Sequence, residues 1–241
     1  MTTPPILQVA GLCKRFGGVI AVDQASFDIA AGTAVGVIGP NGAGKTTLFN
    51  LLSGFETADS GTICFVGQSI ERALPHRTAR LGMGRTFQSV RVFAAMSVRE
   101  NFRVAHMHGR AEKSGGFEER ADEILAFIGL TPHGNSMAGS LSYGQRKLVE
   151  LGMVLITDPL LILLDEPVAG VNPGLIEEIE RLLRQLVGRG LTLLVVEHNL
   201  AFIARVCADV IVMANGAVLT RGSGAEIQGD PRVLEAFLGA A

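Results

Sequence analysis

Apolar residues fall into short continuous runs between polar turns, and this pattern predicts an α/β protein. Residues 34–38, 160–164 and 191–196 are almost entirely apolar, which is typical of parallel strands with both faces covered. Between the last two runs, residues 173–187 place their apolar positions at helical spacing. We therefore predict a strand–helix–strand unit from residue 160 onward and a parallel sheet at the centre of the fold.

The first quarter of the chain predicts a second kind of sheet. Residues 7–12 and 20–29 have strand character, and the second segment partly alternates between apolar and polar positions. A turn at residues 59–61 leads into a further strand at residues 62–66. We expect these short strands to form an antiparallel patch beside the main sheet.

Several helices are indicated by their capping residues. Ser97 and Glu100 form a capping-box pattern that should start a helix. Residues 117–128 carry one apolar face, and the polar segment 108–116 before them is expected to be a loop. Asn172 is a suitable N-cap for the helix that follows it.

The loop after the strand at residues 34–38 fits G-x-x-x-x-G-K-[ST], the pattern of a phosphate-binding loop. Its glycines let backbone N–H groups point at phosphates, and the helix predicted at residues 46–53 adds its positive end. Lys45 can reach the β- and γ-phosphates, and the Thr46 hydroxyl can bind Mg²⁺. We therefore predict nucleotide binding by Gly39, Pro40, Asn41, Gly42, Ala43, Gly44, Lys45, Thr46 and Thr47.

Two acids follow the apolar run at residues 160–164. The carboxyl end of a buried parallel strand is where α/β folds place ligand chemistry. Asp165 can hold Mg²⁺, and Glu166 is placed to polarise an attacking water. Alone, this pair would be better explained as two solvated acids at a strand end; beside a phosphate loop, the catalytic interpretation is favoured.

A histidine follows the next predicted strand. A lone histidine at a strand end is usually structural or solvated, but the position of His198 one strand after the two acids suggests a contact with the γ-phosphate. The remaining histidines lie in polar stretches without matching acids or cysteines, and we expect them on the surface: His76, His106, His108 and His133.

Composition and charge narrow the classes of protein. The chain has 241 residues, of which 48% are hydrophobic and 18% charged, and its net charge is −2. This length suits one large α/β domain, and the slightly acidic net charge does not indicate the basic surface that binds nucleic acid. No apolar run is long enough to span a bilayer, and the N-terminus lacks the regions of a signal peptide. Three scattered cysteines indicate a reducing compartment, so we expect a cytosolic location, free or attached to a membrane partner.

Together these residues resemble the nucleotide-binding subunits of ABC transporters, over essentially the whole chain. The discriminating segment is residues 141–145, Leu-Ser-Tyr-Gly-Gln, which resembles the family signature L-S-G-G-Q. Ser142 reads as an N-cap, with Gln145 completing a capping box, so its hydroxyl lies at a positive helix end. The resemblance implies that Ser142, Gly144 and Gln145 contact the γ-phosphate held by a second subunit, so that each site is shared across a dimer.

The resemblance assigns further residues. Gln88 matches the glutamine that senses Mg²⁺ and water, and it joins Thr46 and Asp165 as a metal ligand. Glu166, His198 and Gln88 are then the catalytic set. Phe16 occupies the position of the aromatic that stacks on adenine; a buried core position for Phe16 is about equally compatible with the sequence.

The implied fold class is an α/β P-loop NTPase core with an antiparallel β subdomain and an α-helical signature subdomain. We expect a single nucleotide-binding domain over residues 1–241. Within it, the helical subdomain covers about 89–157, and a tail helix covers about 231–239.

Two departures from the family pattern point to one branch. Tyr143 replaces the first signature glycine, and Asn172 replaces the acid of the following loop, which keeps hydrogen bonds but not the charge. Both are familiar from ATP-binding subunits of high-affinity branched-chain amino acid importers, as are residues 84–93, 166–173 and 230–239. This implies an ATPase that energises a permease importing amino acids, with branched-chain amino acids favoured. ABC ATPases for urea, amide or lipid transport stay open as alternatives, and a soluble non-transport ABC ATPase is less favoured.

The implied cofactors are ATP and Mg²⁺, and the implied partners are transmembrane permease subunits and a second ATPase subunit, identical or related. A periplasmic solute-binding protein would be an indirect partner, nucleic acid would not be one, and the subunit would lie peripherally on the cytoplasmic face of the membrane. Val90, Val92, Phe93 and Met96 follow Gln88, where the family docks its permease. They could instead form an apolar cluster packed under the subunit's own helices.

Overall fold

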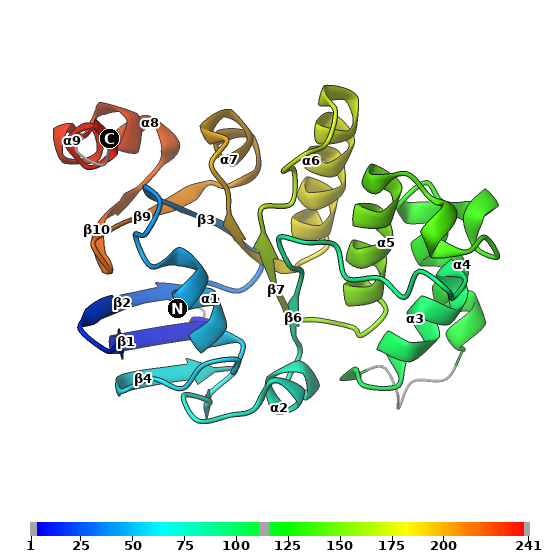
Figure 1. The fold of residues 1–241 in the computed structure, drawn as a ribbon, viewed down its shortest axis with the longest axis horizontal. Coiled ribbons are helices and arrows are strands. Elements are labelled where there is room, and N and C mark those ends of the chain that lie inside the picture. Colours follow the sequence, from blue (N-terminus) through cyan, green and yellow to red (C-terminus); the bar gives the residue numbers. More distant parts are fainter. Residues whose placement is uncertain (1–3, 111–115, 239–241) are drawn as a thin grey trace.

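A mostly parallel six-stranded sheet forms the centre of the computed structural model, which describes residues 4–110 and 116–238 (Figure 1). The strand order is β10-β9-β3-β8-β7-β6, and only β10 runs antiparallel to its neighbour. The predicted strands at residues 34–38, 160–164 and 191–196 are confirmed within one residue at each end. The strands are β3 (Ala34–Ile38), β6 (Met83–Arg85), β7 (Leu161–Asp165), β8 (Thr192–Val196), β9 (Asp209–Ala214) and β10 (Ala217–Gly222).

The predicted antiparallel patch is a second sheet of four strands, in the order β2-β1-β4-β5. Its first two strands are longer than the sequence indicated, because the alternation of buried and exposed residues is interrupted by shifts in their pairing register. The strands are β1 (Leu7–Phe16), β2 (Val19–Ile29), β4 (Ser60–Phe65) and β5 (Gln68–Ser69).

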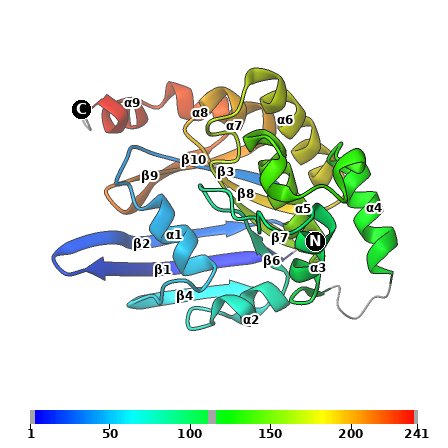
Figure 2. The ribbon, with the colours of Figure 1, turned by 45° about the vertical axis from the view of Figure 1, so that its right-hand side comes forward.

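Helix α1 (Lys45–Leu52) lies between the two sheets (Figures 1 and 2). Its Phe49 and Leu52 are fully buried in one hydrophobic core with residues of both sheets, including Phe65 and Val37. Burial of such a side chain stabilises the fold by about 1.5–3 kcal/mol. The phosphate loop therefore leads into a helix whose position is fixed by packing on both sides.

A group of helices on the β6 side of the central sheet contains the signature segment (Figure 1). Phe102 is fully buried there, and a Cβ on Gly152 would lie 2.4 Å from its ring, so these helices approach closely. The group comprises α3 (Val98–His106), α4 (Phe117–Phe127) and α5 (Tyr143–Leu155), with short 3₁₀ turns at Thr131–His133 and Ala138–Ser140. That residues 89–157 form a separate subdomain stays a prediction. The expected loop at 108–116 includes residues 111–115, which lie outside the described residues.

The capping predictions are confirmed. Ser97 and Glu100 form a complete capping box at the start of α3, and the Asn172 side chain accepts a hydrogen bond from the Leu175 N–H at the start of α6 (Pro173–Gly188). The expected tail helix is α9 (Pro231–Leu238), and residue 239 lies outside the described residues.

The sequence patterns gave no prediction for three short helices, whose length leaves little periodicity to detect. These are α2 (Pro75–Arg80), α7 (Leu200–Val206) and α8 (Gly224–Gly229). Within residues 4–110 and 116–238, no helix combines the length and apolar character that crossing a membrane requires.

Candidate nucleotide-binding site

The phosphate loop joins β3 to α1 and is shaped by two glycines. Gly44 has φ +96°, and a Cβ there would lie 2.1 Å from the Ala21 carbonyl oxygen. A Cβ at Gly39 would lie 2.1 Å from the Met213 carbonyl oxygen. Any larger residue at either position would displace the backbone, so the loop depends on both glycines for contact with neighbouring strands as well as for an approach to phosphate.

Lys45 is buried at the first position of α1, and its Nζ donates to the carbonyl oxygens of Gly39 at 2.7 Å and Pro40 at 2.9 Å. Burial lowers the pKa of Lys45, and the charges of Glu166 and Asp165 oppose that shift. The ammonium group thus lies across the loop, on the side that faces the acids of β7.

The three predicted catalytic residues meet in the structure. The Gln88 amide donates to Glu166 Oε2 at 3.0 Å, and His198 Nε2 lies 3.1 Å from Glu166 Oε1. They follow β6, β7 and β8, which are adjacent parallel strands, so their carboxyl ends open at one edge of the sheet. The structure places His198 against the carboxylate, and its predicted contact with a γ-phosphate stays a prediction.

The backbone of Glu166 adopts an unusual conformation, with φ +49°. Its N–H donates to the Val196 carbonyl at 2.9 Å, and its carbonyl accepts from Lys147 Nζ at 2.7 Å. Lys147 is buried on α5, and burial lowers its pKa against the opposing charge of Glu150. The sequence patterns did not reveal Lys147, because a lysine in the second turn of a helix, two residues after the signature, is expected to be solvated.

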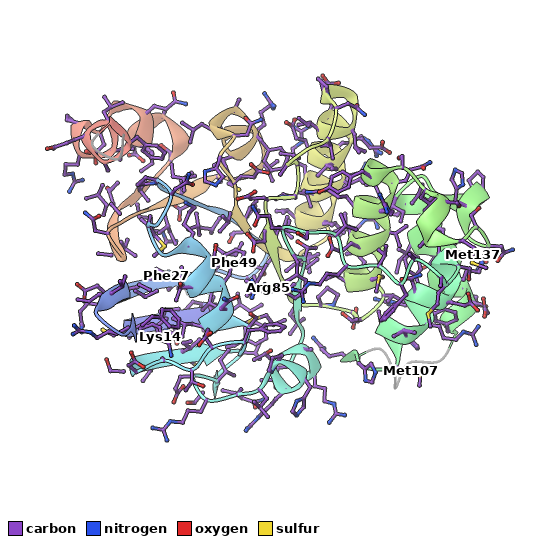
Figure 3. The ribbon with its side chains drawn as sticks, viewed as in Figure 1. Lys14, Phe27, Phe49, Arg85, Met107 and Met137 are labelled. Carbon is purple, nitrogen blue, oxygen red and sulfur yellow. The ribbon has the colours of Figure 1, made fainter. Side chains whose placement is uncertain are left out.

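Asp165 is buried, and its partner differs from the partners of Glu166. Burial raises the pKa of Asp165, and the nearby Arg85 guanidinium, with Nη2 3.5 Å from Oδ2, opposes this. Arg85 also donates to Asn50 Oδ1 at 2.8 Å, on α1, and to Ser53 Oγ at 2.7 Å, at the C-cap of that helix. Figure 3 shows Arg85 at the centre of the molecule, near Phe49. This guanidinium therefore connects the metal-ligand candidate to the helix that follows the phosphate loop.

The predicted Mg²⁺ ligands fit that ion in kind. Thr46, Gln88 and Asp165 offer a hydroxyl, an amide and a carboxylate oxygen, and Mg²⁺ prefers oxygen ligands with few from the protein and the rest from phosphates and water. No cluster of three or more His, Cys, Asp or Glu suited to a metal occurs in the described part of the chain. The donor set thus suits a cation held jointly with a nucleotide.

Phe16 ends β1 with 47% of its surface exposed, so the buried core position that the sequence left open is wrong. Lys14 Nζ lies 5.1 Å from the centre of its ring. An exposed aromatic face is compatible with stacking on a base.

The signature segment starts α5, and its predicted capping box between Ser142 and Gln145 is confirmed. Gly144 packs against α6: a Cβ there would lie 2.2 Å from Leu175 Cδ2. Helices α1 and α5 lie on opposite sides of β6 and β7 (Figures 1 and 2).

The expectation that four histidines are on the surface is wrong for two. His106 and His133 are half-buried, and His133 Nε2 lies 3.3 Å from Gln145 Nε2.

Comparison with known proteins agrees with this geometry. A family model described as "ABC transporter" matches residues 22–169, which include the phosphate loop, the signature segment and both acids. The chain belongs to the ABC transporter family. As an ATP-binding cassette, it is the ATPase component of a transporter, as its sequence motifs predicted.

The relatives of this ABC ATPase are similar over nearly the full length. It is 36% identical to "High-affinity branched-chain amino acid transport ATP-binding protein BraF" of Pseudomonas aeruginosa, over 98% of this chain and 99% of the relative. It is equally identical, with the same coverage, to the protein LivG of the same description in Escherichia coli. Among solved structures, the ADP conformation of the ATP-binding cassette MJ1267 matches with a TM-score of 0.89 and 34% identity, covering 98% of this chain and all of that one.

Glu150 is a buried acid of α5 that the sequence did not single out. Its carboxylate accepts from the N–H groups of Phe87 at 3.4 Å and Arg91 at 3.2 Å, which lie on either side of Gln88. Burial raises its pKa to about 7, although these N–H groups and the charges of Lys147 and Arg91 act in the opposite direction. Because the folded state favours protonated Glu150, the free energy of unfolding falls as pH rises from about 4.5 to about 7.

We predict that Glu150→Gln reduces the dependence of the unfolding free energy on pH in this range. The amide cannot titrate, so the fall in unfolding free energy between pH 4.5 and 7 should shrink by about 3 kcal/mol, as measured by urea unfolding at several pH values. Glu119→Gln, an exposed carboxylate on α4, is the matched control and should leave the slope unchanged. An equal slope in wild type and Glu150→Gln would contradict the burial argument.

Proposed function

We propose that this ABC ATPase powers the import of amino acids through a membrane permease, with branched-chain amino acids as the cargo. The observation that carries the proposal is the 36% identity, over 98% of the chain, to ATP-binding proteins named for branched-chain amino acid transport. The catalytic residues alone do not select a cargo, because transporters of other amides, urea or lipids would need the same ATP chemistry.

In the proposed hydrolysis step, Glu166 is the general base. Gln88 and His198 each contact one oxygen of its carboxylate, which orients the group toward a water beside the γ-phosphate. A positioned base contributes about 10²- to 10⁴-fold to the rate. Phe16 would stack on adenine, while Lys45 and the loop from Gly39 to Thr47 would hold the phosphates.

Thr46, Asp165 and Gln88 would hold Mg²⁺ together with the nucleotide. When bound, this ion neutralises the charge that develops on the phosphate oxygens. The pairing of Asp165 with Arg85 keeps the buried acid partly compensated, and the exposed hydroxyl of Thr46 is accessible at the start of α1.

The working unit is proposed to be a dimer in which Ser142, Gly144 and Gln145 complete the partner's site. Ser142 is exposed at the N-terminus of a 13-residue helix, where the helix dipole favours an anion. A dimer explains why the signature and the phosphate loop lie on different sides of the sheet in one chain. The second subunit can be a copy of this chain or a related ATPase.

The permease is proposed to dock on the segment after Gln88, which places the subunit peripherally on the cytoplasmic face of the membrane. A periplasmic solute-binding protein would deliver the cargo, and nucleic acid has no part. Phe93 and Met96 are 49% and 37% exposed, whereas Val92 packs against the core of the helical group and Val90 is half-buried. Beside them lies a groove of about 370 Å³, lined in part by Phe55, Phe87, Arg91 and Met153.

Replacing the proposed base tests the hydrolytic role. Glu166→Gln should retain ATP binding, measured as a thermal shift with Mg-ATP, and lose at least about 100-fold in phosphate release, because an amide cannot accept the proton. Glu177→Gln on the exposed face of α6 is the control. Turnover at the wild-type rate in Glu166→Gln would remove Glu166 as the base.

Substitution at the docking surface separates coupling from folding. Phe93→Glu should lower transport by the complete complex at least about tenfold while the ATPase activity of the isolated subunit is unchanged, because an exposed side chain contributes little to stability. Met107→Glu, 59% exposed on the same helical group, should affect neither. Val92→Glu should instead destabilise the subunit, because Val92 packs against the hydrophobic core. Normal transport with Phe93→Glu would place the docking surface elsewhere.

The cargo is tested by uptake in cells. Deleting the gene for this chain should abolish high-affinity uptake of radiolabelled leucine, isoleucine and valine, and a plasmid copy should restore it. A copy carrying Glu166→Gln should not restore it, because that variant cannot hydrolyse ATP. If urea or amide uptake is lost instead and leucine uptake is normal, the proposed cargo is wrong.

A further inference from the structure

Helix α5, which begins with the signature, also contacts the hydrolytic residues of its own chain. Lys147 and Glu150 lie about one turn apart on this helix, so they project to the same side. Lys147 Nζ donates to the Glu166 carbonyl at 2.7 Å, and Glu150 accepts from the backbone on either side of Gln88. One helix therefore holds the backbone at both members of the Gln88–Glu166 pair.

Glu166 requires such support because of its backbone. A residue with a Cβ in the left-handed region costs roughly 1–2 kcal/mol relative to the right-handed one, and Glu166 has φ +49°. Such conformations persist only where surrounding contacts determine them. Both backbone polar groups of Glu166 are hydrogen-bonded: the N–H donates to Val196, and the carbonyl accepts from the Ala169 N–H at 3.2 Å within the turn and from Lys147 on α5 at 2.7 Å.

The burial of Lys147 is costly, which argues that its charge has a role beyond packing. The residue is 7% exposed, and removing an ammonium from water is expensive unless it is paired and hydrogen-bonded. Its hydrogen bond within the described residues is the one to the Glu166 carbonyl. The surrounding acids Glu150, Glu197, Glu166 and Asp165 supply compensating charge. A methionine would fill a similar volume without this cost.

We propose that Lys147 is a positioning residue for Glu166. Its ammonium holds the main-chain carbonyl of the left-handed turn, and this aims the carboxylate into the space between Gln88 and His198. The inference rests on the proposed role of Glu166 as general base. Under this proposal, a movement of the signature helix α5 would also move the Glu166 carboxylate of the same chain.

The test compares Lys147→Met and Lys147→Arg in the full-length chain. Lys147→Met keeps the apolar stem and removes the donor; kcat should fall about 10- to 100-fold, since small misplacements of a reacting group cost up to about 100-fold. The KM for ATP and the thermal shift with Mg-ATP should stay within about twofold of wild type. Lys147→Arg should restore part of kcat. If Lys147→Met does not fold, Lys147→Gln, with a neutral donor, should give an intermediate kcat.

A double variant distinguishes positioning from a general structural role. If Lys147 acts through the Glu166 carboxylate, Lys147→Met in the Glu166→Gln background should cause no further loss of residual hydrolysis. The proposal would be overturned if the loss in the double variant were the product of the two single losses. It would also be overturned if Lys147→Met lost ATP binding as much as kcat, or if kcat were unchanged in Lys147→Met alone. Full activity of Glu166→Gln by itself would instead refute the proposed base, whatever Lys147 does.

Discussion

The partners of the acids at the carboxyl ends of the central parallel strands are the constraint on which this structure depends. Asp165 faces Arg85, and Glu166 lies between Gln88 and His198. Glu197, buried at the end of β8, accepts from the Val168 N–H at 3.0 Å. Asp165 and Glu197 are buried, and either one left without a partner would cost several kcal/mol. The order of the parallel strands is what brings partners from distant parts of the sequence to one edge.

This edge also connects the two hydrophobic cores. Arg85 comes from β6, an edge strand of the central sheet. Its guanidinium hydrogen-bonds to Asn50 of α1 and to the C-cap residue Ser53, and α1 packs in the core shared with the antiparallel sheet. Lys147, on the other side, belongs to the helical group. The polar site is therefore the place where the core around α1 meets the core that includes the helical group, and a shift in either one changes the site.

Much of the fold and of the site could be predicted from the sequence, since each depends on local signals. Continuous apolar runs marked β3, β7 and β8, and caps marked α3, α5 and α6. The phosphate loop and the acids at the end of β7 were identified from short patterns. Arg85, Lys147 and Glu150 could not be assigned roles, because their partners lie on other elements and a charged residue in a helix or strand end is usually solvated. Phe16 could be settled only by its exposure, and His133 by its contact with Gln145.

The contact between Gly144 and Leu175 has a consequence for how the signature is interpreted. Helices α5 and α6 can approach this closely only because residue 144 is a glycine without a Cβ. Even one methyl group there would overlap Leu175 Cδ2. In the proposed dimer, two separate demands, internal packing and access for a partner's nucleotide, therefore fall on the same glycine. Enlarging Gly144 alone therefore displaces α6 as well as narrowing the approach of the nucleotide, whereas enlarging Gly144 and shortening Leu175 together relieves only the packing conflict.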